Sequence, residues 1–162
     1  MSADSTLDLS ISVVCYRTPE SQLRGLLDSM VISVGHLLEH QTASVSNLFL
    51  IDNSESPTLT PKILQHFKGS MENLGIKTEL FHGHGNVGYG RAHNMPLNYL
   101  ASDYHLMLNP DVVIEERALH SALTTLKRDT SIKLLSPAAT SEDGRPLHLC
   151  KRYPSVLLLA LR

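Results

Sequence analysis

The sequence predicts an α/β fold, in which a mostly parallel sheet has helices on both of its faces. Strand-like apolar runs and segments with helical spacing alternate about five times and are joined by short loops. Several of the strand-like runs are continuously apolar, as expected for parallel strands that are covered on both sides. With 162 residues, the chain is long enough for one ordinary globular domain with a core.

The first strand and helix are predicted near the amino terminus. Residues 9–16 begin with alternation and become continuously apolar, which is typical of a buried strand. Leucines, Met30 and Val34 then follow at helical spacing over residues 23–38. Thr18 or Ser21 is available as the cap of this helix.

The second strand and helix carry clearer boundary signals. Residues 48–51 predict a second buried strand, which ends in the turn-rich segment 52–57. Thr60 and Pro61 are a cap and a proline at the first helical position, and the helix that they begin extends to Gly75.

The second half of the chain continues the alternation. Residues 77–81 and 105–108 predict the third and fourth strands, and residues 92–100 are helical in pattern, although Pro96 must bend or restart that helix. Residues 117–128 predict a further helix, and residues 132–135 a fifth strand. A turn is expected at Asp143-Gly144.

Composition excludes several classes of protein. The net charge is −2 with both signs interspersed, so nucleic-acid binding is not expected. The only cysteines are Cys15 and Cys150, and no Asn-x-Ser/Thr acceptor occurs, which favours a cytoplasmic protein. Residues 1–8 are predicted to be a flexible lead-in, residues 9–154 one domain, and residues 155–162 an apolar tail too short to span a bilayer.

A glycine-rich stretch is the most informative motif. Residues 83–88 spell Gly-His-Gly-Asn-Val-Gly, and Asp111 follows about twenty residues later, as in a dinucleotide-binding fingerprint. Two predicted strands precede this motif, however, and Pro96 interrupts the helix that would receive a pyrophosphate. The glycines are also explained by a loop that needs positive φ angles.

The polar residues of this region lie after predicted strands, where open α/β sheets bind ligands. Arg91 and Asn94 are close to Gly88 along a helix start, so a guanidinium and an amide could converge on an anionic or hydroxyl-bearing ligand. Asp52 ends the second strand, where its carboxylate could accept hydrogen bonds from a base or ribose. Asp111 follows the fourth strand and suits a divalent ion that bridges phosphates. Turn-forming and capping roles are the alternatives for these residues.

Together these segments resemble the family 2 inverting glycosyltransferases, in particular their rhamnosyltransferase-like branch with the GT-A (Rossmann-like) fold. The resemblance covers residues 9–154. Residues 13–17 and 50–54 are similar to the family's first two strand ends, and residues 86–94 resemble its Asn-x-Gly-Phe-Ala-x-x-x-Asn donor loop. Asn109-Pro110-Asp111 resembles its metal-binding D-x-D motif, and Asp143-Gly144-Arg145 with Arg152-Tyr153-Pro154-Ser155 the segment after its fifth strand.

The resemblance implies transfer of a sugar, plausibly rhamnose, from a nucleotide-diphosphate donor such as dTDP-rhamnose or a UDP-sugar to a polysaccharide or lipid-linked acceptor. It implies Mg²⁺ or Mn²⁺ held by Asp111 at the diphosphate, and attack by an acceptor hydroxyl with the help of a carboxylate base. Peripheral association with the inner face of the cytoplasmic membrane is also expected. The implied donor-binding residues are Tyr16, Arg17, Thr18, Asp52, Ser54, Gly88, Arg91, Asn94 and Asn109.

The sequence departs from the family pattern at three points. Arg17 stands where asparagine is usual, and Asn109 replaces the first aspartate of D-x-D. The family's catalytic base and acceptor-binding half have no counterpart here, so no catalytic residue is assigned, and we expect a fold truncated before the acceptor half that binds donor without appreciable transfer. A non-catalytic nucleotide-binding or oligomerisation module is the alternative function.

Overall fold

The computed structural model describes residues 7–141 and 143–147. They belong to two compact units, and the boundary between Thr124 and Thr125 falls inside α4 (Ala118–Arg128). Cys150, the segment Arg152–Ser155 and the predicted apolar tail over residues 155–162 lie outside the described residues.

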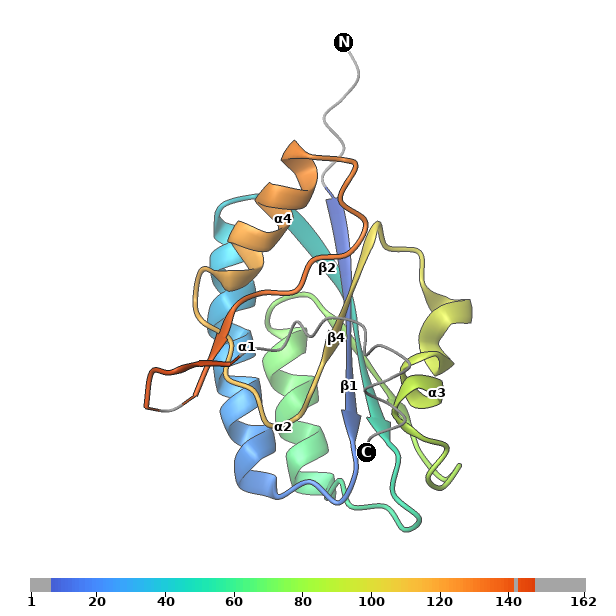
Figure 1. Cartoon of the computed structure of the whole chain (residues 1–162). Coiled ribbons are helices and arrows are strands. Elements are labelled where there is room, and N and C mark those ends of the chain that lie inside the picture. Colours follow the sequence, from blue (N-terminus) through green and yellow to red (C-terminus); the bar gives the residue numbers. More distant parts are fainter. Residues whose placement is uncertain (1–6, 142, 148–162) are drawn as a thin grey trace, which may run out of the picture. The chain divides into compact units, whose positions relative to one another are not determined.

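The first unit is built on a parallel four-stranded sheet (Figure 1). The strands are β1 (Leu7–Cys15), β2 (Ala43–Asp52), β3 (Lys77–Phe81) and β4 (Tyr104–Leu108), in the order β3-β2-β1-β4. β1 pairs with both β2 and β4. Leu7 and Asp8, which the sequence assigns to the lead-in, are therefore the first residues of β1. Parallel pairing brings the carboxyl ends of all four strands to one edge.

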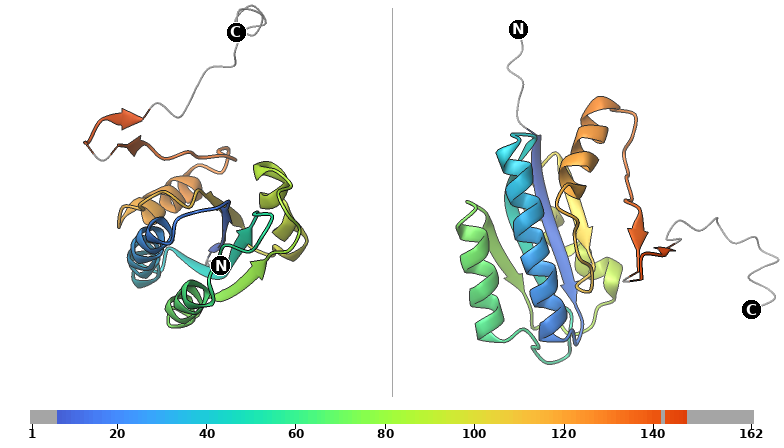
Figure 2. Two further views of the ribbon diagram at one scale, coloured as in Figure 1. Left: turned by 90° about the horizontal axis from the view of Figure 1, so that it is seen from below. Right: turned by 90° about the vertical axis from the view of Figure 1, so that its left-hand side faces the viewer.

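Two long helices cover one face of this sheet, as Figure 2 shows. They are α1 (Glu20–Glu39) and α2 (Pro61–Glu72). In α2 the predicted cap is confirmed, because the Thr60 side chain accepts a hydrogen bond from the N–H of Ile63 at 3.3 Å. In α1 the predicted cap is wrong: Pro19 occupies the N-cap without a side-chain bond, and the Thr18 hydroxyl accepts from the N–H of Tyr16 instead.

The opposite face is covered by two short helices, α3 (Tyr89–His93) and the 3₁₀ helix η1 (Met95–Tyr99). The predicted interruption at Pro96 is confirmed, because the helix over residues 92–100 is divided at Asn94 and Pro96 lies in the first turn of η1. An apolar cluster holds this layer on the sheet; it contains Val14, Phe49, Ile51 and Ala92, with Phe81, Val87, Met95 and Leu100 packed against it.

A chain of buried and partly buried hydrogen bonds also joins α3 to the sheet. The Ser12 hydroxyl lies 2.8 Å from Nδ1 of His93 and 2.9 Å from Nε2 of His105. The Ser10 hydroxyl lies 2.7 Å from Nδ1 of His105 and 2.6 Å from the Ser102 hydroxyl. Burial, together with the neighbouring His105, lowers the pKa of His93 to about 4, so this imidazole is neutral at pH 7.

The second unit contains an antiparallel pair of short strands, β5 (Ala139–Thr140) and β6 (Pro146–Leu147). The turn predicted at Asp143-Gly144 is present, and Gly144 has a φ of 79°. The strand predicted over residues 132–135 is wrong, because these residues have no regular secondary structure and Leu134 is 84% exposed. A short apolar run does not reveal whether a neighbouring strand is there to pair with it.

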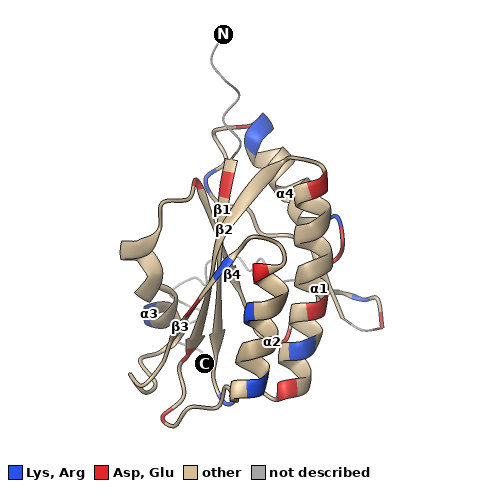
Figure 3. Cartoon of the chain, turned by 180° about the vertical axis from the view of Figure 1, so that it is seen from behind, with Lys and Arg blue, Asp and Glu red and all other residues tan. Residues whose placement is uncertain are grey.

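Acidic and basic side chains are mixed along α1 and α2 (Figure 3), so these helices do not carry a field of one sign. Among the described residues, every helix is too short or too polar to cross a membrane.

We predict that acid destabilises the protein through His93. The pKa of His93 is about 4 in the folded state and about 6.5 in unfolded chains. The contribution of neutral His93 to the free energy of unfolding is therefore complete above pH 6.5 and is lost as the pH falls toward 4. Urea unfolding at several pH values should show this loss. His93→Gln should reduce it and leave the part that comes from His105, whose pKa is also lowered by burial. The exposed His66 is the matched control, since His66→Gln should leave the pH dependence as in the wild type.

A wild-type free energy of unfolding that is constant between pH 7 and pH 4.5 would contradict a neutral, buried His93.

Candidate functional site

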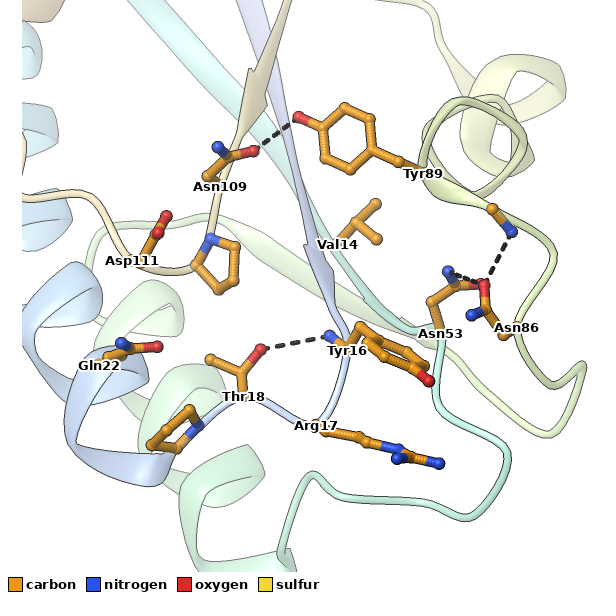
Figure 4. A pocket seen from close by; sticks show the side chains of 13 residues that line it. Val14, Tyr16, Arg17, Thr18, Gln22, Asn53, Asn86, Tyr89, Asn109 and Asp111 are labelled. Carbon is orange, nitrogen blue, oxygen red and sulfur yellow. Dashed lines mark hydrogen bonds between the residues drawn. The ribbon is translucent and has the colours of Figure 1, made fainter. Parts of the chain in front are cut away.

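A pocket of about 540 Å³ lies at the carboxyl edge of the sheet (Figure 4). Its size is within the range of roughly 300–1,000 Å³ that is usual for small-molecule sites. The lining residues come from the end of β1 and the start of α1, and from the loops after β2, β3 and β4. They are Val14, Tyr16, Arg17, Thr18, Pro19, Gln22, Asn53, Asn86, Gly88, Tyr89, Asn109, Pro110 and Asp111.

Asp52 shapes the loop after β2 and does not line this pocket. Its side chain is 1% exposed. One carboxylate oxygen accepts from the backbone N–H groups of Thr58 and Leu59 at 2.6 and 3.0 Å. The other accepts from the N–H of Ser54 and the hydroxyl of Thr58, both at 3.2 Å. Burial acts to raise the pKa of Asp52, but the backbone bonds from Leu59 and Thr58 outweigh it and lower the pKa below its ordinary value.

Asn53 connects the loop after β2 to the glycine loop after β3. Its backbone N–H donates to the carbonyl of Cys15 at 2.8 Å, which fixes it beside the end of β1. Its side chain accepts from the N–H of Val87 at 3.0 Å and donates to Oδ1 of Asn86 at 3.1 Å. The same Asn86 oxygen accepts from the N–H of Gly88 at 3.0 Å. The conformation of the glycine loop therefore depends on two asparagine side chains.

Gly88 holds the most demanding backbone conformation of the site. It is the N-cap residue of α3, with a φ of 86° and a ψ of 153°, a region that side chains with a Cβ atom rarely adopt. Gly83 and Gly85 also have positive φ angles, of 81° and 68°. The prediction of a loop that needs glycine is therefore confirmed.

Tyr89 links the glycine loop to the loop after β4. Its hydroxyl donates to Oδ1 of Asn109 at 2.8 Å (Figure 4). Its ring lies edge-on to His93, with 4.5 Å between ring centres. Burial and the negative charge of Asp111 raise the pKa of the Tyr89 phenol, so it stays a donor at neutral pH. This bond uses one lone pair of the Asn109 amide oxygen, so the second lone pair and the NH₂ group remain to contact a ligand or a cation.

The donor set for a divalent ion is small. Asp111 and Asn109 are exposed and line the pocket, so the chain offers one carboxylate and one amide there. Within the described ranges, no three or more His, Cys, Asp or Glu side chains are grouped to hold a metal ion. Mg²⁺ commonly uses one or two carboxylates and completes its shell with substrate phosphates and water. The residues therefore fit such an ion together with a diphosphate.

The structure brings most of the predicted site residues together. Those that line the pocket are Tyr16, Arg17, Thr18, Gly88, Asn109 and Asp111. Asp52 and Ser54 are buried behind it, where the Ser54 hydroxyl accepts from the N–H of Arg17 at 3.0 Å. Arg91 and Asn94 are exposed at α3 and its end, and neither lines the pocket.

Sequence reasoning did not select Asn53, Asn86, Tyr89 or Gln22, which also line the pocket. A usable signal was present for the asparagines, since each follows the end of one of two neighbouring strands.

Comparison with known proteins agrees with this arrangement. Residues 10–160 match the family described as "Glycosyl transferase family 2". The chain belongs to this family. A search of curated proteins gives no match.

A solved structure shows the same fold as this family 2 chain. The crystal structure of residues 1–349 of S. aureus TarS superposes with a TM-score of 0.55 at 20% sequence identity. The match covers 75% of this chain but only 33% of the TarS chain. At this identity the likeness shows the fold, which is the predicted GT-A arrangement of a parallel sheet flanked by helices.

We predict that Asp52→Asn destabilises the loop after β2. The amide cannot accept all the bonds that the carboxylate accepts, so the free energy of unfolding at pH 7 should fall by about 1–3 kcal/mol. Since the pKa of Asp52 is lowered by folding, its contribution is present above about pH 4 and is lost below it. Urea unfolding at pH 7 and pH 3 measures both effects.

The exposed Asp28 on α1 provides the control, because Asp28→Asn removes the same charge without these bonds. Equal stability of the two variants at pH 7 would show that the Asp52 carboxylate does not shape the loop.

We predict that Gly88→Ala costs about 1–3 kcal/mol because alanine is strained at this φ and ψ. A Cβ atom at Gly88 meets no heavy atom within 4 Å, so the cost comes from the backbone alone. Gly90, one residue inside α3, has an ordinary φ and equal space, and Gly90→Ala should leave stability unchanged or slightly higher. Urea unfolding of both variants is the measurement, and equal effects would refute the assigned strain.

Proposed function

We propose that this chain holds the nucleoside-diphosphate-sugar donor of a family 2 glycosyltransferase. The observation that carries this proposal is the convergence of all four strand-end loops on one pocket, with the glycine loop and Asn109-Pro110-Asp111 connected by the bond from Tyr89. The chain spans about a third of the TarS chain. Sugar transfer is therefore also a proposal, because this chain matches only a third of that longer chain.

The lining side chains suggest which part of the donor binds at each side of the pocket. Tyr16 and Thr18, with Asn53 beside them, offer an aromatic ring and polar groups to the base and ribose. The amide of Asn109 and the carboxylate of Asp111 lie at the loop after β4, toward which we place the diphosphate. We assign Asp52 and Ser54 an indirect role, in which they position the loop and the backbone of Arg17. Direct contacts of Arg91 and Asn94 with the donor stay predictions.

Asp111, assisted by Asn109, would hold Mg²⁺ or Mn²⁺ at the donor. A bound divalent ion would neutralise the negative charge that develops on the diphosphate leaving group. The residues of this chain orient the donor: Tyr89 fixes Asn109, and Asn86 fixes the glycine loop. No described residue is assigned as the carboxylate base for the acceptor hydroxyl, and inversion at the sugar stays a prediction.

The finer identity of the reaction rests on the sequence resemblance. Rhamnose from dTDP-rhamnose, or the sugar of a UDP-sugar, is the proposed group, and a polysaccharide or lipid-linked molecule is the proposed acceptor. Association with the inner face of the cytoplasmic membrane is also a proposal.

We predict that nucleotide sugars raise the melting temperature of this chain and that Mn²⁺ increases the effect. A ligand that binds only the folded state stabilises it according to its concentration and affinity. A thermal-shift screen of dTDP-rhamnose and UDP-sugars, each with and without Mn²⁺, measures this. Asp111→Ala should abolish the Mn²⁺-dependent part, whereas Glu72→Ala, an exposed acidic residue at the end of α2, should preserve it.

If only a nicotinamide dinucleotide raises the melting temperature, the donor-binding proposal is wrong. A non-catalytic module, in contrast, would keep its partner in the Asp111→Ala variant.

A further inference from the structure

Arg17 is the only basic side chain among the described residues that line the pocket. A nucleoside diphosphate brings two or more negative charges, and the pocket already contains the carboxylate of Asp111. The other arginine that the sequence suggested for this role, Arg91, is exposed on α3 and does not line the pocket. Among the residues that the structure describes at this pocket, Arg17 is therefore the source of positive charge for a diphosphate.

The backbone of Arg17 is held in an uncommon conformation. Its φ is 50°, in the left-handed region that residues other than glycine seldom adopt. Such a conformation persists where the surroundings fix it. Here the N–H of Arg17 donates to the Ser54 hydroxyl at 3.0 Å, and Ser54 is itself held by the carboxylate of Asp52. The loop after β2 therefore determines where the Arg17 side chain begins.

The guanidinium of Arg17 is held at the pocket by a weak, exchangeable partner. One nitrogen lies 3.2 Å from Oε2 of Glu55, and the group lies 5.2 Å from the centre of the Tyr16 ring. The Tyr16 hydroxyl donates to the other Glu55 oxygen at 3.2 Å. The side chains of Arg17 and Glu55 are 67% and 52% exposed. Ion pairs this exposed contribute little, so a stronger anion can replace the carboxylate.

The Glu55 carboxylate is charged at neutral pH. Its own backbone N–H, the Tyr16 hydroxyl and Arg17 lower its pKa. A diphosphate offers more negative charge than a carboxylate, and its oxygens match the paired N–H donors of a guanidinium. Figure 4 shows Arg17 beside Tyr16 on one side of the pocket and Asp111 on the other. The Arg17 side chain is 67% exposed, so rotation about its side-chain bonds can move the guanidinium away from Glu55.

We propose that Arg17 binds the diphosphate of the donor directly, and that Glu55 holds the guanidinium in the free protein and competes with the donor for it. The proposal rests on the function proposed above. It has two consequences. Part of the affinity for a nucleoside diphosphate does not require a divalent ion, and neutralising Glu55 strengthens binding.

Isothermal titration calorimetry with UDP, dTDP and the corresponding monophosphates, in EDTA and in Mg²⁺, tests this proposal. In EDTA, Arg17→Ala should weaken binding of the diphosphate by about tenfold and of the monophosphate by less, because one charge-assisted interaction is lost. Arg17→Lys should be intermediate, since it keeps the charge without the paired donors. Glu55→Gln should strengthen diphosphate binding by about threefold.

The control is the pair Arg24–Glu20 on α1, which is also partly exposed and lies outside this pocket. Arg24→Ala and Glu20→Gln change the net charge equally and should leave both affinities unchanged. If Arg17→Ala fails to fold, Arg17→Lys and Glu55→Gln still decide the matter.

Three outcomes would overturn the inference: equal diphosphate affinity of Arg17→Ala and the wild type, weaker binding by Glu55→Gln, or wild-type binding that vanishes in EDTA. In each of these cases wild-type binding in Mg²⁺ leaves the proposed function standing. A wild-type chain that binds neither UDP nor dTDP in Mg²⁺ would overturn both.

Discussion

The position of β1 between β2 and β4 is the constraint on which the site depends. In the register of the sheet, Cys15 pairs with Asp52 and Val13 pairs with Leu108. Because all the strands run in the same direction, the segments that follow them emerge at one edge. The pocket is lined by Val14 of β1 and by residues that follow β1, β2, β3 and β4, so its assembly depends on this pairing. A register shift of one residue would also exchange the two faces of β1.

The loops at that edge are fixed by side chains that bond to backbone groups. Asp52 and Asn53 are adjacent in the sequence, yet they hold different segments: Asp52 binds its own loop, and Asn53 binds the glycine loop. Tyr89 then connects the glycine loop to Asn109. The asparagine and tyrosine side chains that make these bonds also line the pocket. The site is therefore arranged before a ligand arrives, which reduces the ordering cost of binding.

Much of this organisation could be predicted from the sequence. Apolar periodicity located the four strands of the main sheet, and Thr60, Pro61 and Pro96 located a helix start and a helix break. These signals depend only on residues that are adjacent in the sequence, so they can be recognised without knowing which segments pack together. The predicted strand at residues 132–135 is wrong because strand formation requires a partner, and a four-residue apolar run does not specify one.

Placement of side chains within the site was harder to predict for the same reason. Arg91 and Arg17 are both close to pocket motifs in the sequence. Arg17 follows β1 with a left-handed backbone and lines the pocket, whereas Arg91 lies on α3 and does not. The Asp52 carboxylate accepts hydrogen bonds whether it contacts a ligand or organises a turn, so the residue type alone does not distinguish the two roles. In the structure Asp52 organises the loop because the N–H groups of Thr58 and Leu59 reach its carboxylate. The position of Asp52 at a strand end does not predict these two contacts.

The central claim is that a nucleoside diphosphate binds at the carboxyl edge of the sheet, between the loops that β1 and its neighbours position. Titration of ¹⁵N-labelled protein with UDP or dTDP, followed by amide chemical shifts, tests it most directly. The account predicts the largest shifts at residues 16–18, 53–54 and 86–89, and at Asn109 and Asp111. Shifts concentrated instead in the groove between α1 and α2, at Arg24, Lys62 and Asn73, would contradict it.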